Sequence, residues 1–197
     1  MKPPCISDEQ PPTGGSPSFA TTPGTNSRTP RRPTVMKIRE GVYCAQGYAL
    51  ANVHFVIAER SVVVIDTAES VTAARAVLRD FRKICPLPVS YIIYTHHHGD
   101  HVRGAKVFQS ASTRIIAQRK MPEERAKVAL LLPYRTRTDR LQFGLALEER
   151  ERGVSHASYG ESGYVPPDIT FDTEHRFEEG NVRFEIYHAP GESVDHG

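Results

Sequence analysis

Apolar residues alternate with polar ones, or form short runs rich in Val and Ile, in several segments of this sequence. Segments of this length and pattern predict β-strands. The strands are expected at residues 41–46, 53–59, 61–66, 89–94, 114–118, 169–177 and 181–188. The second and third of these runs adjoin one another, which predicts a hairpin that turns near Glu59 and Arg60.

A second pattern, with apolar residues three or four positions apart, predicts helices. The helix that follows Ser70, its expected N-cap, is predicted to run to about Ile84, where Pro86 ends it. One face of this helix carries Val71, Ala74, Val77, Leu78 and Phe81. Further helices are expected at 104–110, 122–132 and 140–152, with a loop at 153–167. Because strands and helices interleave, the fold class is predicted to be α/β.

Residues 1–35 have a different composition from the rest. They hold eight of the fifteen prolines, many Ser, Thr and Gly residues, and Phe19 as their only aromatic residue. A segment with so little apolar surface cannot offset the entropy cost of ordering. The sequence therefore predicts a disordered tail over 1–35 and one folded domain over 36–197.

Composition excludes several classes of protein. The chain has 197 residues and a net charge of +2, and no apolar run approaches the roughly 20 residues that span a bilayer. The basic stretch 114–140 lacks interleaved aromatic residues, so no nucleic-acid partner is expected. Three scattered cysteines and an N-terminus without an apolar leader predict a cytoplasmic protein. Nothing in the sequence indicates an oligomeric state.

Candidate chemistry is concentrated in the run Thr95-His-His-His-Gly-Asp-His101, which holds four of the nine histidines. His96 and His98 are two residues apart, so both can turn to one side at the end of a strand. Asp100 and His101 follow one turn later, near a second position. Imidazole nitrogens and carboxylate oxygens suit zinc and similar divalent ions, and a nitrogen and oxygen set is typical of catalytic sites.

These motifs resemble the metallo-β-lactamase superfamily. The matching features are Val-Val-Ile-Asp-Thr at 63–67, a helix, Tyr-Ile-Ile-Tyr at 91–94, the histidine motif, and Gly104 after it. The resemblance implies a four-layer αββα sandwich that holds one or two Zn²⁺ ions at the common edge of its sheets. It also implies a role for Asp66, which would orient the motif loop from behind the metal ligands.

The same resemblance implies the ligand set. His96 and His98 would hold the first ion, and Asp100 and His101 the second. Many members complete the first site with a His after Pro-Gly, where this chain has Glu192. A carboxylate at this place is similar to the alkylsulfatase branch, whose loop begins Ala-Pro-Gly and supplies a glutamate ligand. Four further segments resemble that branch, namely 116–118, 134–135, 141–144 and 165–167.

Two histidines flank Glu192 and remain alternative ligands, His188 and His196. Family members continue past this loop with an acidic residue that bridges the metals and with a later His. Because the sequence ends at Gly197, we expect a C-terminally truncated chain with an incomplete sandwich and an incomplete second site.

The predicted function is that of a zinc-dependent hydrolase in which a metal-bound hydroxide attacks an alkyl sulfate or similar small-molecule ester. Asp100 is the candidate catalytic residue, and Arg135 or Arg137 is expected near an anionic leaving group. One alternative is a thioesterase or lactonase of the same superfamily, in which a His is expected in place of Glu192. Another is a non-catalytic metal-binding remnant. Neither Gly-Glu-Ser segment completes Gly-x-Ser-x-Gly, which excludes a serine hydrolase.

Overall fold

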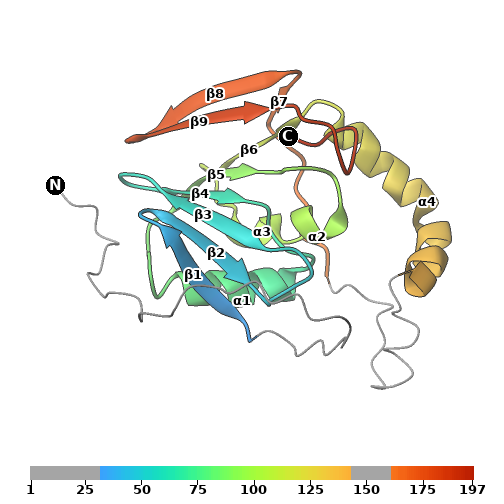
Figure 1. The fold of residues 1–197 in the computed structure, drawn as a ribbon, viewed down its shortest axis with the longest axis horizontal. Helices are drawn as coiled ribbons and strands as arrows, with labels where there is room; N and C mark the ends of the chain where they lie inside the picture. The colour runs from blue at the N-terminus through green and yellow to red at the C-terminus, as the bar shows by residue number, and fades with distance from the viewer. Residues whose placement is uncertain (1–31, 143–160) are drawn as a thin grey trace, which may run out of the picture.

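The computed structural model describes residues 32–142 and 161–197, and its central element is a seven-stranded sheet (Figure 1). The strands lie side by side in chain order. Antiparallel pairing joins the first four strands, and parallel pairing joins the last four. Their bounds are β1 Thr34–Arg39, β2 Val42–Gln46, β3 Val53–Ile57, β4 Val62–Ile65, β5 Val89–Ile93, β6 Arg114–Gln118 and β7 Ile169–Phe171.

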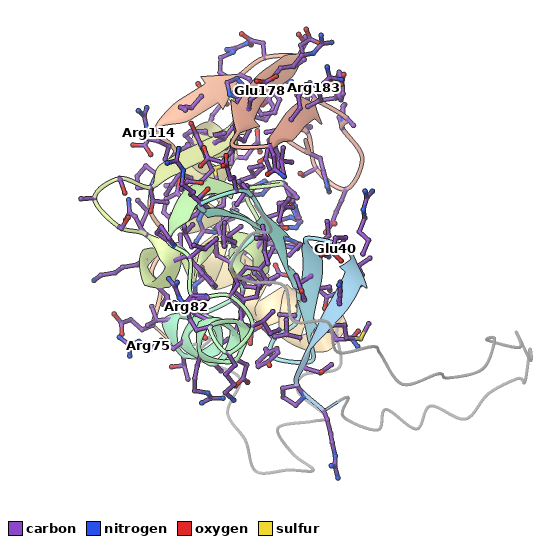
Figure 2. The ribbon with its side chains drawn as sticks, turned by 90° about the vertical axis from the view of Figure 1, so that its left-hand side faces the viewer. Glu40, Arg75, Arg82, Arg114, Glu178 and Arg183 are labelled. Atoms are coloured by element: carbon purple, nitrogen blue, oxygen red, sulfur yellow. The ribbon has the colours of Figure 1, made fainter. Side chains whose placement is uncertain are left out.

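A small antiparallel sheet of β8 (Glu174–Glu179) and β9 (Val182–Tyr187) covers one face of the large sheet. The helices are α1 Val71–Phe81, α2 Gly99–Val102, α3 Ala105–Phe108 and α4 Met121–Gln142. Helices α1 and α3 cover the other face of the large sheet, whereas α4 extends to one side of the sheets (Figure 1). In Figure 2, Arg75 and Arg82 project from α1 at one end of the molecule, and Glu178 and Arg183 lie at the other end on β8 and β9.

The two faces of the large sheet carry separate cores, because successive side chains of a strand point to opposite faces. On the helix side, Phe55 of β3 stacks on Phe81 of α1 with ring centroids 3.8 Å apart. On the other side, Val63, Ile93 and Ile116 contact the inner residues of β9. Helices, large sheet and small sheet form three layers of the αββα sandwich, which confirms the predicted fold class.

Helix α1 follows the predicted pattern. The Ser70 hydroxyl accepts a hydrogen bond from the backbone N–H of Ala73 at 3.2 Å, as expected for an N-cap. The helix buries Val71, Ala74 and Val77, and it ends at Phe81 rather than Ile84. Three turn residues follow Phe81, and Pro86 disfavours helical backbone at the preceding residue, Cys85.

The structure corrects the predicted strand 169–177. It consists of β7, which pairs with β6 in the large sheet, and of β8, which begins the small sheet. The sequence could not show this break, because two linking residues preserve the alternation. Phe171 and Phe177 therefore keep the same parity although they belong to different sheets.

Other boundaries also differ from the prediction. Strand β1 was not predicted, and it begins at Thr34, two residues before the expected domain start. The helix predicted at 122–132 continues to Gln142 through Pro133. Most of the helix predicted at 140–152, part of the loop predicted at 153–167 and nearly all of the predicted tail lie outside the described residues. Within the described part, no helix is both long and apolar enough to cross a membrane.

Gly104 fixes the distance between α3 and the segment after β4. A Cβ atom at this position would lie 1.8 Å from the carbonyl oxygen of Thr67 and 2.6 Å from Ala74 Cβ. Only glycine permits this approach. The histidine motif, which precedes Gly104, is thereby held against the end of β4.

Candidate metal centre

The histidine motif begins where β5 ends, and Asp66 lies where the neighbouring parallel strand β4 ends. The carboxyl ends of parallel strands meet at one edge of a sheet, which is where ligands bind in sheets of this kind. The backbone N–H of Asp66 donates to the carbonyl of Ile93 at 2.9 Å, so the two strand ends are in direct contact.

Asp66 holds both ends of the motif loop, as the sequence predicted. Its carboxylate is buried and accepts hydrogen bonds from the Thr95 N–H at 3.0 Å, the Thr95 hydroxyl at 2.9 Å and His101 Nδ1 at 2.7 Å. The next residue, Thr67, donates its N–H to the carbonyl of His101 at 2.6 Å. Asp66 and Ala68 have φ angles of 58° and 68°, a costly conformation that these contacts maintain.

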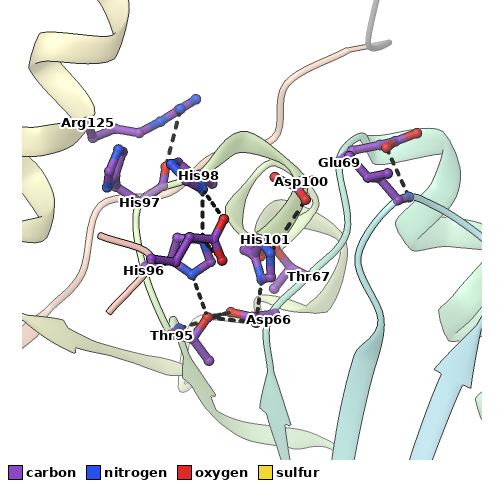
Figure 3. Close-up of polar contacts among 12 residues, drawn as sticks. Asp66, Thr67, Glu69, Thr95, His96, His97, His98, Asp100, His101 and Arg125 are labelled. Atoms are coloured by element: carbon purple, nitrogen blue, oxygen red, sulfur yellow. Dashed lines mark hydrogen bonds and ion pairs between the residues drawn. The ribbon is translucent and has the colours of Figure 1, made fainter. Parts of the chain in front are cut away.

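The side chains of His96, His98 and Glu192 converge, with one ligand atom from each within 4.8 Å of the others. Figure 3 shows His96 and His98 in this arrangement. His96 Nε2 lies 2.9 Å from His98 Nδ1, which lies 3.1 Å from Glu192 Oε1. The other carboxylate oxygen, Glu192 Oε2, lies 3.9 Å from His96 Nε2. Two segments of the chain, whose residues His98 and Glu192 are 94 positions apart, therefore supply three possible ligand atoms to one place.

This donor set fits a divalent metal ion. Two ligands of one tetrahedral zinc at about 2.0–2.1 Å are separated by about 3.3 Å. The separations of 2.9 Å between His96 Nε2 and His98 Nδ1 and of 3.1 Å between His98 Nδ1 and Glu192 Oε1 are close to that value. Two imidazole nitrogens and a carboxylate cannot face one another without a proton or a cation between them. In the part of the chain that the structure describes, these three residues form the one group of three donors close enough to share an ion.

Hydrogen bonds behind His96 set its tautomer. The Thr95 hydroxyl donates to Asp66, so it accepts from His96 Nδ1 at 3.0 Å. His96 therefore carries its proton on Nδ1 and presents the lone pair of Nε2 to His98 and Glu192. Burial and the neighbouring imidazoles also lower the pKa of His96 to about 4, which keeps the ring neutral near pH 7.

Asp100 and His101 form a separate pair beside this group. His101 Nε2 lies 3.5 Å from Asp100 Oδ2, and the rings of His101 and His96 lie 4.2 Å apart. Burial opposes protonation of His101, but the hydrogen bond and negative charge of Asp66 raise its pKa. The four motif residues predicted as ligands thus lie together, and α2, which the sequence analysis missed, carries Asp100 and His101.

Glu192 has the ionisation state that a ligand needs. Burial raises the pKa of this carboxyl, but His96 and His98 outweigh that effect and lower the pKa below its ordinary value. The flanking histidines lie outside the three-donor group. His188 Nε2 contacts the carbonyl of Val194 at 2.8 Å, and His196 stacks on His96 with ring centroids 4.6 Å apart.

The structure brings one unpredicted cation to this edge of the sheet. Arg125 of α4 lies 5.3 Å above the ring centroid of Tyr164, and its Nη1 is 3.5 Å from the carbonyl oxygen of His97. No local sequence pattern marks Arg125, because the packing of α4 beside Tyr164 brings it to the motif. The side chains of Arg135 and Arg137, which the sequence analysis favoured, lie outside the described part of the chain.

Residues 47–197 match the family model of the metallo-β-lactamase superfamily. The chain belongs to this superfamily, whose members are hydrolases. It is 30% identical over 151 residues to a linear primary-alkylsulfatase from a Pseudomonas species, covering 70% of this chain and 29% of that protein. It is also 28% identical over 173 residues to the alkyl/aryl-sulfatase BDS1 of Saccharomyces cerevisiae, covering 80% of this chain and 27% of that protein.

Among solved structures, the sec-alkylsulfatase Pisa1 from Pseudomonas sp. matches with a TM-score of 0.62 and 18% identity, over 83% of this chain and 28% of that one. This likeness shows the fold. The predicted superfamily and the resemblance to alkylsulfatases are confirmed by these comparisons. The chain spans less than a third of the length of the curated relatives that it matches.

Proposed function

We propose that this chain forms the metal-binding core of a zinc hydrolase that acts on alkyl sulfates or similar small anionic esters. The convergence of His96 Nε2, His98 Nδ1 and the Glu192 carboxylate carries the proposal. The similarity to proteins named as alkylsulfatases supports the substrate class.

His96, His98 and Glu192 would hold the first ion, and Asp100 and His101 would contribute to a second position. A divalent ion at such a site supplies Lewis acidity that activates water near neutral pH. The Asp66–Thr95–His96 hydrogen bonds keep the ligand nitrogen deprotonated before any ion arrives. Asp100, whose Oδ2 lies 3.5 Å from His101 Nε2, would orient the attacking water.

The charges around the site suit an anionic ester. A carboxylate ligand makes the first site less positive than a third neutral imidazole would, and so weakens its Lewis acidity. Arg125 places a guanidinium beside the motif loop, where positive charge stabilises an anionic leaving group such as sulfate. Sulfate is a better leaving group than an alkoxide, so a weaker Lewis acid is sufficient.

Metal binding is the first test of this proposal. The chain is freed of metal, dialysed against Zn²⁺ and analysed for bound zinc. We expect at least one ion in the unaltered chain and loss of the first ion in His98→Asn. The variant His175→Asn is the control, because His175 lies on β8 in the small sheet. An unaltered chain that binds no zinc, or a His98→Asn variant with full zinc content, would overturn the assignment.

The substrate is tested by comparing three reactions of the zinc-loaded chain. Release of sulfate from an alkyl sulfate is the expected activity. Thiol release from a thioester or opening of a lactone, without sulfate release, would instead favour the other hydrolases of the superfamily. Zinc binding without any of these activities would identify a metal-binding module.

A further inference from the structure

The segment that carries Glu192 is a closed loop between β9 and Gly197. Its first residue, His188, donates its N–H to the carbonyl of Thr173, and its last residue, Gly197, donates to the carbonyl of Thr95. Inside the loop, the N–H of Ala189 donates to the carbonyl of His196 at 2.9 Å. The loop therefore returns to the start of the histidine motif.

Glu192 itself makes few contacts that could hold it in place. Its side chain is 60% exposed, and its carboxylate contacts His96 and His98. An exposed glutamate has several flexible torsions, whose ordering costs entropy. The position of the carboxylate must therefore depend on how firmly its loop is held against the motif.

Asp195 is the buried residue of this loop. Among residues 188–197, all of which the structure describes, it alone is classed as buried, and its side chain is fully inaccessible. Asp195 Oδ1 lies 2.8 Å from Nδ1 of His97, which is itself buried. A buried carboxylate without such a partner would be costly, so this contact is strongly specified.

His97 lies between the two predicted ligands in sequence, but its side chain contacts a different residue of the loop, Asp195. His96 and His98 converge with Glu192, whereas His97 contacts Asp195. The three consecutive histidines thus contact one loop at two points, Glu192 and Asp195. The stacking of His196 on His96, with an interplanar angle of 12°, adds a third contact between the same segments.

We propose that the buried Asp195–His97 hydrogen bond is a positioning contact that holds Glu192 in the ligand set. This inference rests on the proposed metal-binding function of His96, His98 and Glu192. Asp195 and His97 are positioning residues in it, since neither belongs to the group of three donors. Supporting contacts around metal ligands are generally worth about 10–100-fold in metal affinity.

The first experiment measures Zn²⁺ affinity by competition with a chromophoric chelator. We expect Asp195→Ala to weaken binding by at least about tenfold. Asp195→Asn, which keeps an oxygen acceptor for His97, should lie between Asp195→Ala and the unaltered chain. Asp80→Asn is the matched control, because Asp80 also contacts a partner, Tyr48, but on α1. It should lower stability without changing the zinc affinity.

A double-mutant cycle separates positioning from general destabilisation. If Asp195 acts through Glu192, then Glu192→Gln should cost much less affinity in the Asp195→Ala background than in the unaltered chain. Equal costs of Glu192→Gln in both backgrounds would overturn the inference, as would an unchanged affinity in Asp195→Ala.

A readout on the metal-free chain distinguishes this inference from the proposed function. Hydrogen exchange of the backbone N–H groups of Ala189 and Gly197 reports whether the loop stays docked. We expect faster exchange at both positions in Asp195→Ala and no change in Asp80→Asn. If the unaltered chain bound no zinc but Asp195→Ala still showed faster exchange, the metal function would fail and the positioning contact would stand. Unchanged exchange would refute the positioning contact in either case.

Discussion

Asp66 Oδ2 lies 2.7 Å from His101 Nδ1, so a residue at the end of β4 holds a residue 35 positions later in the chain. The same carboxylate holds Thr95 at the other end of the histidine motif. One buried side chain therefore sets the path of the whole loop between Thr95 and His101.

Asp66→Asn should loosen this loop. An amide keeps one acceptor oxygen but presents an N–H₂ group where His101 or Thr95 donates, so one buried donor loses its partner. We expect a loss of about 2 kcal/mol in the free energy of unfolding, measured by denaturant titration. Asp172→Asn, an exposed carboxylate, serves as the control. Equal stability of Asp66→Asn and the unaltered chain would contradict the role given to Asp66.

Substitutions of Thr95 test whether its hydroxyl sets the tautomer of His96. Thr95→Val keeps the shape of the side chain but removes the hydroxyl that accepts from His96 Nδ1. We expect zinc affinity to fall by about tenfold, while Thr95→Ser, which keeps the hydroxyl, should bind zinc nearly as tightly as the unaltered chain. Chelator competition measures both variants. The prediction fails if the valine and serine variants bind zinc equally well.

Gly104 tests the close approach of α3 to the segment after β4. Gly104→Ala places a methyl group against the backbone of Thr67, so the elements must separate. We expect a loss of more than about 3 kcal/mol in the free energy of unfolding, toward the upper end of single-residue effects. Gly191→Ala is the control, because its nearest contact would be 3.9 Å away. Similar melting temperatures for Gly104→Ala and Gly191→Ala would contradict the predicted effect of the close approach at Gly104.

Tyr48 and Asp80 provide a test of pH dependence. Burial and the hydrogen bond to Asp80 raise the pKa of Tyr48 to about 12. The folded chain then holds this proton more tightly than the unfolded chain, in which the pKa of tyrosine is about 10. Between these pH values stability should fall as pH rises. Because burial also raises the pKa of Tyr94 and Tyr164, the titration of Tyr48 is identified by difference. Ultraviolet difference titration should show a late component that is lost in Tyr48→Phe and shifts to lower pH in Asp80→Asn.

The sequence predicted those parts of the site whose residues lie close together in the chain. The spacing of His96, His98, Asp100 and His101 directly after an apolar strand was sufficient to predict a candidate metal centre at a strand end. Asp66 and Glu192 were identified by their resemblance to family motifs. The structure places both beside the histidines.

Contacts between distant segments were not predictable in the same way. His97 and Asp195 are 98 residues apart, and neither has a local pattern that distinguishes it from its neighbours. The break between β7 and β8 could not be predicted, because the alternation of apolar and polar residues continues without a shift from Phe171 to Phe177. Arg125 was missed because only the packing of α4 beside Tyr164 brings it to the motif.

The distance along the chain between His98 and Glu192 also has a consequence for biosynthesis. A growing polypeptide exposes the imidazoles long before their carboxylate leaves the ribosome, since 94 positions separate the two. Under the proposed metal function, an ion bound at that stage would have an incomplete set of donors and would dissociate readily. Retention of the ion would then indicate that β8 and β9 have docked on the large sheet.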